Sequence, residues 1–134
     1  MLSLLYPRRW QIASIFLLVS VLVFALLPAI WLWPGGSLGS LELTDKFLHG
    51  LTFTVLAVWF SGQYARQAYW KLALGLLLFG AMIEAFQYLL PYRSSETGDM
   101  FADVTGITIG LIIALLGAGG WSLRAEAWLQ EKIG

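Results

Sequence analysis

Few residues in this chain could do acid–base or ion-binding chemistry, and three of them lie within or beside long apolar segments. These are His49, Glu84 and Asp103. A carboxylate on an apolar helix is costly in hydrocarbon unless it has a partner or reaches water, so such a residue is a candidate for function by default. Histidine changes its charge near physiological pH, which suits proton transfer. We therefore expect these three residues to be the catalytic groups, if the protein is an enzyme.

Further polar residues accompany them and could bind a substrate. The candidate substrate-binding residues are Asp45, Lys46, Gln87, Arg93 and Asp99. Lys46 and Arg93 could each bind a lipid phosphate or pyrophosphate, and arginine is better suited to bidentate contact. A histidine with two or three carboxylates could also bind a divalent metal ion, although helical spacing alone leaves the metal site unknown. The sequence contains no cofactor fingerprint, nucleotide-binding loop or nucleophile motif.

Each candidate also has a purely structural interpretation. Glu84 and His49 could hydrogen-bond to another helix and fix the packing, and Gln87 is more typical of such bonds than of catalysis. Asp45 and Asp99 could cap helices and complement their dipoles. The two cations could anchor the chain at a membrane surface.

Composition places the chain in a membrane. Of its 134 residues, 59% are hydrophobic and 12% are charged, and the mean hydropathy is +0.76. A soluble domain carries about 25% charged residues. The net charge of zero gives no case for nucleic-acid binding. Because the chain has no cysteine, it has neither a disulfide framework nor a thiolate metal site.

Four apolar runs are each long enough to cross a bilayer, which takes about 20 residues in a helix. They lack the alternation of a membrane barrel, so helices are the natural way to satisfy their backbone polar groups. We predict one all-α domain, residues 1–134, that forms an integral membrane four-helix up-down bundle. The predicted spans are residues 12–33, 47–64, 72–90 and 100–121, followed by an interfacial tail at 122–134. The first run is too long for a cleavable signal peptide.

The basic residues predict the orientation. Six of the eight lie on one side of the predicted spans, namely Arg8, Arg9, Arg66, Lys71, Arg124 and Lys132. Positive charge is enriched on the cytoplasmic side of membrane proteins, so both termini are expected in the cytoplasm. Trp10 and Trp121 lie near predicted interfaces, as in an aromatic belt.

This orientation places the candidate groups at similar depth. His49 lies near the outer start of the second predicted helix and Asp103 near that of the fourth. Glu84 lies about 10 Å below the outer end of the third predicted helix, at 1.5 Å per residue. We expect no comparable polar set in the inner half. Gly106 and Gly110 have helical spacing and would permit close helix contact.

Three motifs occur in order along the chain: Asp-Lys-Phe-Leu-His at 45–49, Glu-Ala-Phe-Gln at 84–87, and Asp-Met-Phe-Ala-Asp-Val-Thr-Gly at 99–106. With Arg93, they resemble the VanZ-like family, whose pattern is D-K-x-x-H, E-x-x-Q, an arginine after the third helix, and D-x-x-x-N-x-x-G. The resemblance covers residues 44–116 and implies a multi-pass bacterial inner-membrane protein linked to teicoplanin resistance. Asp103 departs from the pattern because the family usually has asparagine there, so this chain has an additional ionisable group.

Three classes of function are open. The first is an enzyme or binding protein that acts on a cell-envelope lipid at the outer face or affects glycopeptide (teicoplanin) susceptibility, and we favour it because the candidate groups lie near headgroup depth. The second is a non-catalytic accessory subunit of a larger complex of membrane proteins. The third is a small transporter, which the expected lack of an inner polar path disfavours. The sequence leaves open whether the protein catalyses a reaction.

Overall fold

The computed structural model describes residues 2–26, 38–89 and 97–133, with side chains described except at 38–45 and 97–99. Its elements are all helical, which confirms the all-α prediction for the described residues. They are α1 (Pro7–Leu26), α3 (Leu38–Ser61), a 3-10 turn η1 (Arg66–Ala68), α4 (Tyr69–Tyr88), α5 (Thr97–Ile113), a π-helical turn η2 (Ala114–Ala118) and α6 (Trp121–Ile133).

Several helix boundaries differ from the predicted ones. α1 begins at Pro7, before the apolar run, because proline is well suited to the first helical position, where an N–H would have no partner. α3 begins at Leu38, so Asp45 lies inside the helix and the expectation that it caps the helix start was wrong. Asp99 lies in the first turn of α5. The fourth predicted run is broken at Ala114–Ala118, where Gly117 has a non-helical backbone conformation.

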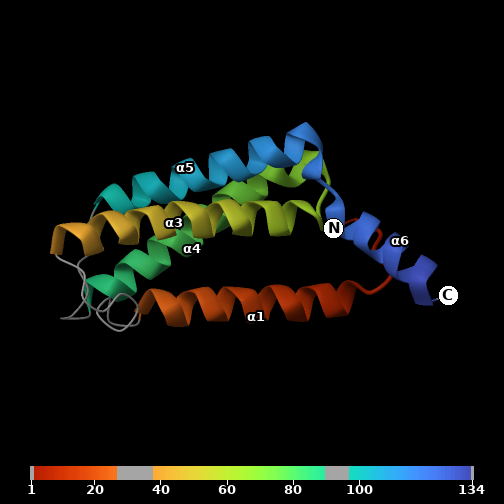
Figure 1. Ribbon diagram of the computed structural model, residues 1–134, viewed down its shortest axis with the longest axis horizontal. Coiled ribbons are helices and arrows are strands. Elements are labelled where there is room, and N and C mark those ends of the chain that lie inside the picture. The colour runs from red at the N-terminus through yellow and green to blue at the C-terminus, as the bar shows by residue number, and fades with distance from the viewer. Residues whose placement is uncertain (1, 27–37, 90–96, 134) are drawn as a thin grey trace.

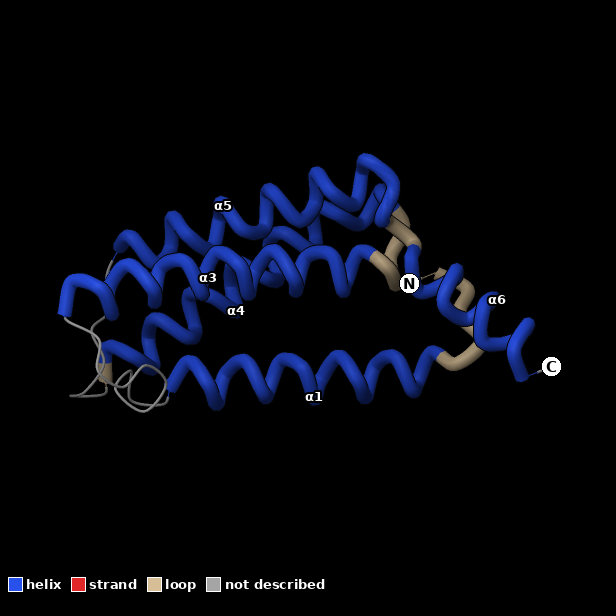
Figure 2. The backbone as a smooth tube through the Cα atoms, viewed as in Figure 1, coloured by secondary structure: helices blue, strands red, loops and turns tan. Residues whose placement is uncertain are grey.

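The four long helices lie along one axis, and the two termini are found at the same end of it (Figure 1; the tube in Figure 2 follows the same path). We call this the proximal end; it also carries α6. At the opposite, distal end, α1 and α4 finish and α3 and α5 begin. The distal and proximal ends therefore bring together segments that are far apart in the sequence.

The closest helix contact is between α3 and α5, and it depends on glycine. A Cβ atom on Gly106 would collide with the carbonyl group of Gly50, and one on Gly110 would lie 2.6 Å from the carbonyl oxygen of Thr54. The Thr54 hydroxyl lies 2.8 Å from the carbonyl oxygen of Gly50 and 3.1 Å from that of Gly106, and it can donate to either. The prediction that Gly106 and Gly110 permit close helix contact is confirmed.

The core is small, and much of the outer surface is apolar. Its buried residues are Phe53, Leu56, Ala57, Leu76, Ile83 and Ile107. Large apolar side chains such as Phe16 and Phe101 point outward, with exposed fractions of 74% and 69%. Such an apolar surface is unfavourable in water and suits contact with lipid.

Three described helical segments are long and apolar enough to cross a membrane: Pro7–Leu26, Arg66–Tyr88 and Met100–Ala118. The apolar helix at Lys46–Ser61 is shorter. These segments overlap the four runs identified in the sequence and support a membrane protein.

Candidate functional site

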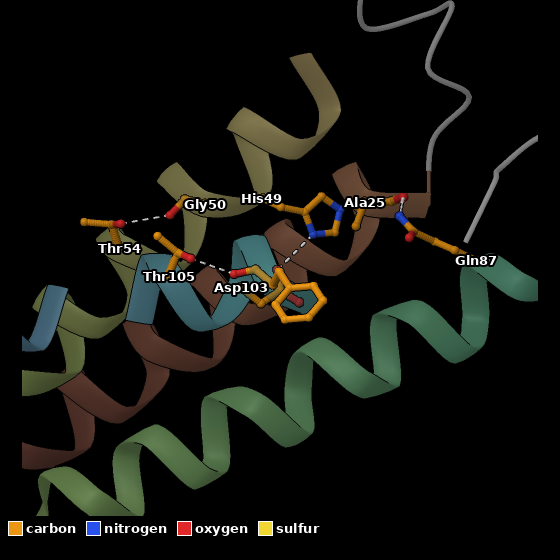
Figure 3. Close-up of polar contacts among 8 residues, drawn as sticks. Ala25, His49, Gly50, Thr54, Gln87, Asp103 and Thr105 are labelled. Carbon is orange, nitrogen blue, oxygen red and sulfur yellow. Dashed lines mark hydrogen bonds and ion pairs between the residues drawn. The ribbon is translucent and has the colours of Figure 1, made fainter. Parts of the chain in front are cut away.

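His49 and Asp103 form a buried pair between α3 and α5. Nδ1 of His49 lies 3.0 Å from Oδ1 of Asp103 (Figure 3), and the two side chains are 8% and 0% exposed. The glycine contact described above explains the pairing, since His49 precedes Gly50 and Asp103 lies one turn before Gly106. The close backbone approach therefore brings these two polar side chains within hydrogen-bond distance.

A third helix completes the surroundings of Asp103. A Cβ atom on Gly80 of α4 would lie 2.5 Å from Oδ2 of Asp103 and 3.2 Å from the Phe53 ring, so a larger residue there would have to displace the carboxylate. Glu84 follows Gly80 by one turn on the same face of α4 and is buried, with 9% exposed. The structure thus places the three candidate catalytic groups in one region of the distal half.

The depth of this region follows from helix geometry. Asp103 lies about 9 Å from the start of α5, and Glu84 lies about 6 Å from the end of α4, at 1.5 Å per residue. Both carboxylates are therefore within two turns of the distal end. The sequence-based expectation of a similar depth agrees with this arrangement.

Gln87 has a packing role in the structure. Its side chain is fully buried, and Nε2 donates a hydrogen bond of 2.8 Å to the carbonyl oxygen of Ala25 (Figure 3). The last carbonyl groups of a helix lack partners within that helix, so this bond joins α4 to the final turn of α1. Gln87 therefore fixes the position of α1 at the distal end.

The other candidate binding residues are described less fully. Lys46 is half-buried on α3. Asp45 and Asp99 are placed by their backbones alone, and Arg93 lies outside the described residues. Among the described residues, no group of three histidine, aspartate or glutamate side chains could hold a metal ion.

The geometry of the His49–Asp103 pair allows proton exchange. When Asp103 is ionised, its carboxylate only accepts hydrogen bonds, and Nδ1 of His49 is then the donor. In the neutral imidazole, Nε2 is then the basic nitrogen, and the carboxylate stabilises the imidazolium that forms when Nε2 takes a proton. In acid–base catalysis, a carboxylate often orients a histidine by such a contact.

The proximal half contains a second polar cluster, which contradicts the expectation that the inner half has none. The buried Ser14 hydroxyl accepts hydrogen bonds from Nε1 of Trp59, at 2.9 Å, and from Nε2 of Gln63, at 3.0 Å. The Trp59 ring packs against those of Trp10 and Trp121, with ring centroids 5.8 and 5.3 Å away. Trp10 and Trp121 are therefore part of a packed aromatic cluster in addition to lying near an end of the bundle.

Glu126 of α6 is the buried charge of this proximal cluster. Its carboxylate accepts hydrogen bonds from the backbone N–H groups of Leu5, at 2.8 Å, and Tyr6, at 2.9 Å, and from Nε1 of Trp10, at 3.0 Å. Burial alone would raise the pKa of Glu126, but the three donors together lower the pKa below its ordinary value of 4.5. Glu126 thus joins α6 to the chain segment that leads into α1.

Sequence reasoning missed this proximal cluster for identifiable reasons. Its members are individually ordinary: a serine, a glutamine and tryptophans that also suit a membrane interface. The one available signal was the spacing of Trp10 and Ser14, which lie one turn apart on the same face of the first helix. The partner of Glu126 could not be read from the sequence because its strongest donors are backbone N–H groups more than a hundred residues away.

A family model described as VanZ/LLP1 matches residues 4–118. The chain belongs to the VanZ/LLP1 family. The match contains His49, Glu84 and Asp103, and it ends before α6, so Glu126 lies beyond the matched part of this VanZ/LLP1 protein. Neither curated proteins nor solved structures gave a match.

Proposed function

We propose that this VanZ/LLP1 protein is a multi-pass protein of the bacterial inner membrane, folded as a four-helix up-down bundle with both termini in the cytoplasm. The six basic residues on one side of the apolar runs support this orientation. The two termini lie together at the proximal end, as an even number of spans requires. The distal half, with His49 and Asp103, then faces the outer leaflet.

In this proposal the distal half forms a site for the headgroup of a cell-envelope lipid. The observation that carries it is the 3.0 Å contact between the buried His49 and Asp103 side chains. Burying a charged or titratable pair in a membrane protein is costly and marks functional sites more often than packing sites. Glu84 lies one turn after Gly80, the residue that packs against the Asp103 carboxylate. It adds a second carboxylate to the same region.

The proposed chemistry is recognition of a phosphate-bearing lipid, with proton exchange through His49. The sequence predicts two cations on this side of the membrane, Lys46 and Arg93, and such cations suit phosphate oxygens. Asp103 orients the imidazole and stabilises its charged form. Asp45 and Asp99 complete the proposed binding set, and a divalent ion bridging carboxylate and phosphate is compatible with these ligands.

Membership of the VanZ/LLP1 family supports a link to glycopeptide resistance, and we propose teicoplanin susceptibility as the readout of this activity. His49→Gln keeps a polar side chain but removes the titratable group. In cells that depend on this chain for tolerance, it should abolish tolerance at unchanged protein abundance. Thr105→Val is a matched control, because Thr105 is exposed and its hydroxyl bonds only to its own helix, at the carbonyl oxygen of Phe101.

The alternative of a non-catalytic accessory subunit is supported by Gln87, whose side-chain N–H joins α4 to α1 through the Ala25 carbonyl oxygen. If every distal polar residue acted in this way, variants that preserve hydrogen bonding would keep full function. Tolerance that survives His49→Gln at normal abundance would favour this accessory role. A small transporter would need a polar path joining the distal residues to the proximal cluster.

A further inference from the structure

An apolar groove runs along α1 in the proximal half, far from the distal site. Its volume is about 520 Å³. The groove is lined by Ile12, Ala13, Phe16 and Leu17 of α1 and by Trp59 of α3, with Arg9 at one end and Ser20 at the other. Ser14 is the one buried residue of α1, so most of this helix faces outward.

The hydroxyl and indole groups that border the groove are already bonded within the protein. The Ser20 hydroxyl donates to the carbonyl oxygen of Phe16, at 2.8 Å. The indole N–H of Trp59 donates to the Ser14 hydroxyl, at 2.9 Å. The groove therefore offers apolar surface to an occupant along its length, with a cation at one end only.

The length of the groove matches one leaflet of a bilayer. From Arg9 to Ser20 along the helix is about 16 Å at 1.5 Å per residue. Half of the hydrocarbon core of a bilayer is about 15 Å. A single acyl chain that began at the level of Arg9 would reach the end of the groove near the bilayer midplane.

The charged end of the groove fits an anionic headgroup. Arg9 is exposed, and its guanidinium lies over the Tyr6 ring, 5.0 Å from the ring centroid. Arg9 also lines a second cavity of about 270 Å³ between α1 and α6, with Leu129 and Ile133 on its far wall. Guanidinium groups bind phosphate oxygens bidentately, and anionic lipids concentrate near basic residues on the cytoplasmic leaflet.

We propose that this groove is a binding site for an anionic phospholipid of the cytoplasmic leaflet, with its phosphate on Arg9 and one acyl chain between α1 and Trp59. The carboxylate of Glu126, which lines the second cavity, does not repel the phosphate strongly because backbone N–H groups of Leu5 and Tyr6 and the indole of Trp10 already solvate it. This lipid site rests on the proposed orientation, which puts the proximal end in the cytoplasmic leaflet, but it does not depend on the proposed distal site.

Native mass spectrometry of the purified full chain in detergent tests this site, with phosphatidylglycerol and phosphatidylcholine of identical acyl chains as probes. Phosphatidylglycerol should bind more tightly. Arg9→Gln should weaken its binding about fivefold, as one basic residue at an anionic surface implies. Arg8→Gln is the matched control, because Arg8 is also exposed but does not line the groove.

A second pair of variants tests the acyl-chain part of the site. Ala13→Phe should fill the groove and reduce binding of both lipids, whereas Ile15→Phe, on a part of α1 that does not line the groove, should not. Equal binding of the two lipids, or equal losses for Arg8→Gln and Arg9→Gln, would overturn the proposal. A dimer that binds no lipid and is lost in Ala13→Phe would show that a second copy of the chain occupies the groove instead. None of these variants touches His49 or Asp103, so failure here leaves the proposed function standing.

Discussion

The imidazole of His49 and the carboxylate of Asp103 contact each other from two helices whose backbones touch at Gly50 and Gly106. The pair and the glycine contact are thus one structural unit: moving the backbones apart would separate the side chains. The carboxylate is further confined by Gly80 on α4. A substitution at any of these glycines should therefore act on the pair as well as on the packing.

Substitutions at His49 and at Asp103 should lower the free energy of unfolding by different amounts. His49→Leu leaves the buried Asp103 carboxylate without its imidazole partner and should lower the free energy of unfolding by about 3–5 kcal/mol. Asp103→Asn keeps a hydrogen-bond acceptor facing Nδ1 and should cost about 0.6 kcal/mol, the average for interhelical polar bonds in membranes. Thermal unfolding in detergent measures both. Equal losses for the two variants would contradict a buried pair whose charge resides on Asp103.

The glycine contact can be tested with a control from the same protein. Gly106→Leu should force α5 away from Gly50 and cost about 1–3 kcal/mol, as overpacking does. Gly75 on α4 has no atom within 4 Å of an added Cβ, so Gly75→Ala should stabilise its helix by about 0.5–1 kcal/mol. Melting temperatures in detergent should therefore move in opposite directions. If both variants lowered the melting temperature equally, the close α3–α5 contact would be wrong.

Glu126 makes stability depend on pH in a defined direction. Its pKa in the folded protein is below the ordinary value of 4.5, so its ionised form favours folding. This contribution is complete above pH 4.5 and is lost as the pH falls through the lowered pKa. Glu126→Gln should remove that part of the pH dependence. Melting temperatures of the wild type and the variant should converge on acidification, and a constant difference between pH 7 and the acid range would contradict the assignment.

Truncation at the same residue tests the link between α6 and the N-terminal segment. Glu126→Ala removes the acceptor of three hydrogen bonds and should cost about 1.5–3 kcal/mol, the range for hydrogen bonds to a charged group. Amide hydrogen exchange at Leu5 and Tyr6 should accelerate with it. Glu131→Ala is a control, because Glu131 is exposed on the same helix, and it should leave both measurements unchanged.

Glu84→Gln separates a charge-dependent site from a packing role. If the carboxylate acts in the distal site, the variant should be as abundant as the wild type but should lose teicoplanin tolerance. If Glu84 only joins helices, glutamine should serve nearly as well, since such bonds contribute about 0.6 kcal/mol on average. Abundance, melting temperature and tolerance are measured in parallel. Full tolerance in well-expressed Glu84→Gln would remove Glu84 from the proposed site.

The sequence was sufficient to predict the helical class and the membrane setting, because both depend on the length and composition of the apolar runs. It was also sufficient to predict the family, which depends on the order of the motifs. It also anticipated the pairing region, since His49 and Asp103 are rare polar residues at matching depth. It did not predict that α3 begins at Leu38, because the apolar run that predicted this helix starts only at residue 47. The π-helical turn at Ala114–Ala118 has no signal in the apolar pattern, which continues through it.

The larger failure concerns the proximal half. The sequence-based expectation rested only on the candidate residues of the outer half, so Ser14 and Gln63, which are polar but common on helices, were not counted. Their contact joins residues 49 positions apart and depends on the way α1 packs against the end of α3. Nor could the sequence assign Gln87 to the carbonyl oxygen of Ala25, because the partner is a backbone atom whose exposure depends on where α1 ends.

The most direct test of the distal site uses the fact that His49 is the only histidine of the chain. Its imidazole ¹⁵N signals therefore need no assignment in a spectrum of the histidine-labelled protein in detergent. The site proposed here predicts a protonated Nδ1 and a change in the Nε2 signal when a polyprenyl phosphate is added as the probe lipid, with no such change for phosphatidylcholine. Signals that stay the same at saturating polyprenyl phosphate would contradict a lipid-phosphate site built on His49 and Asp103.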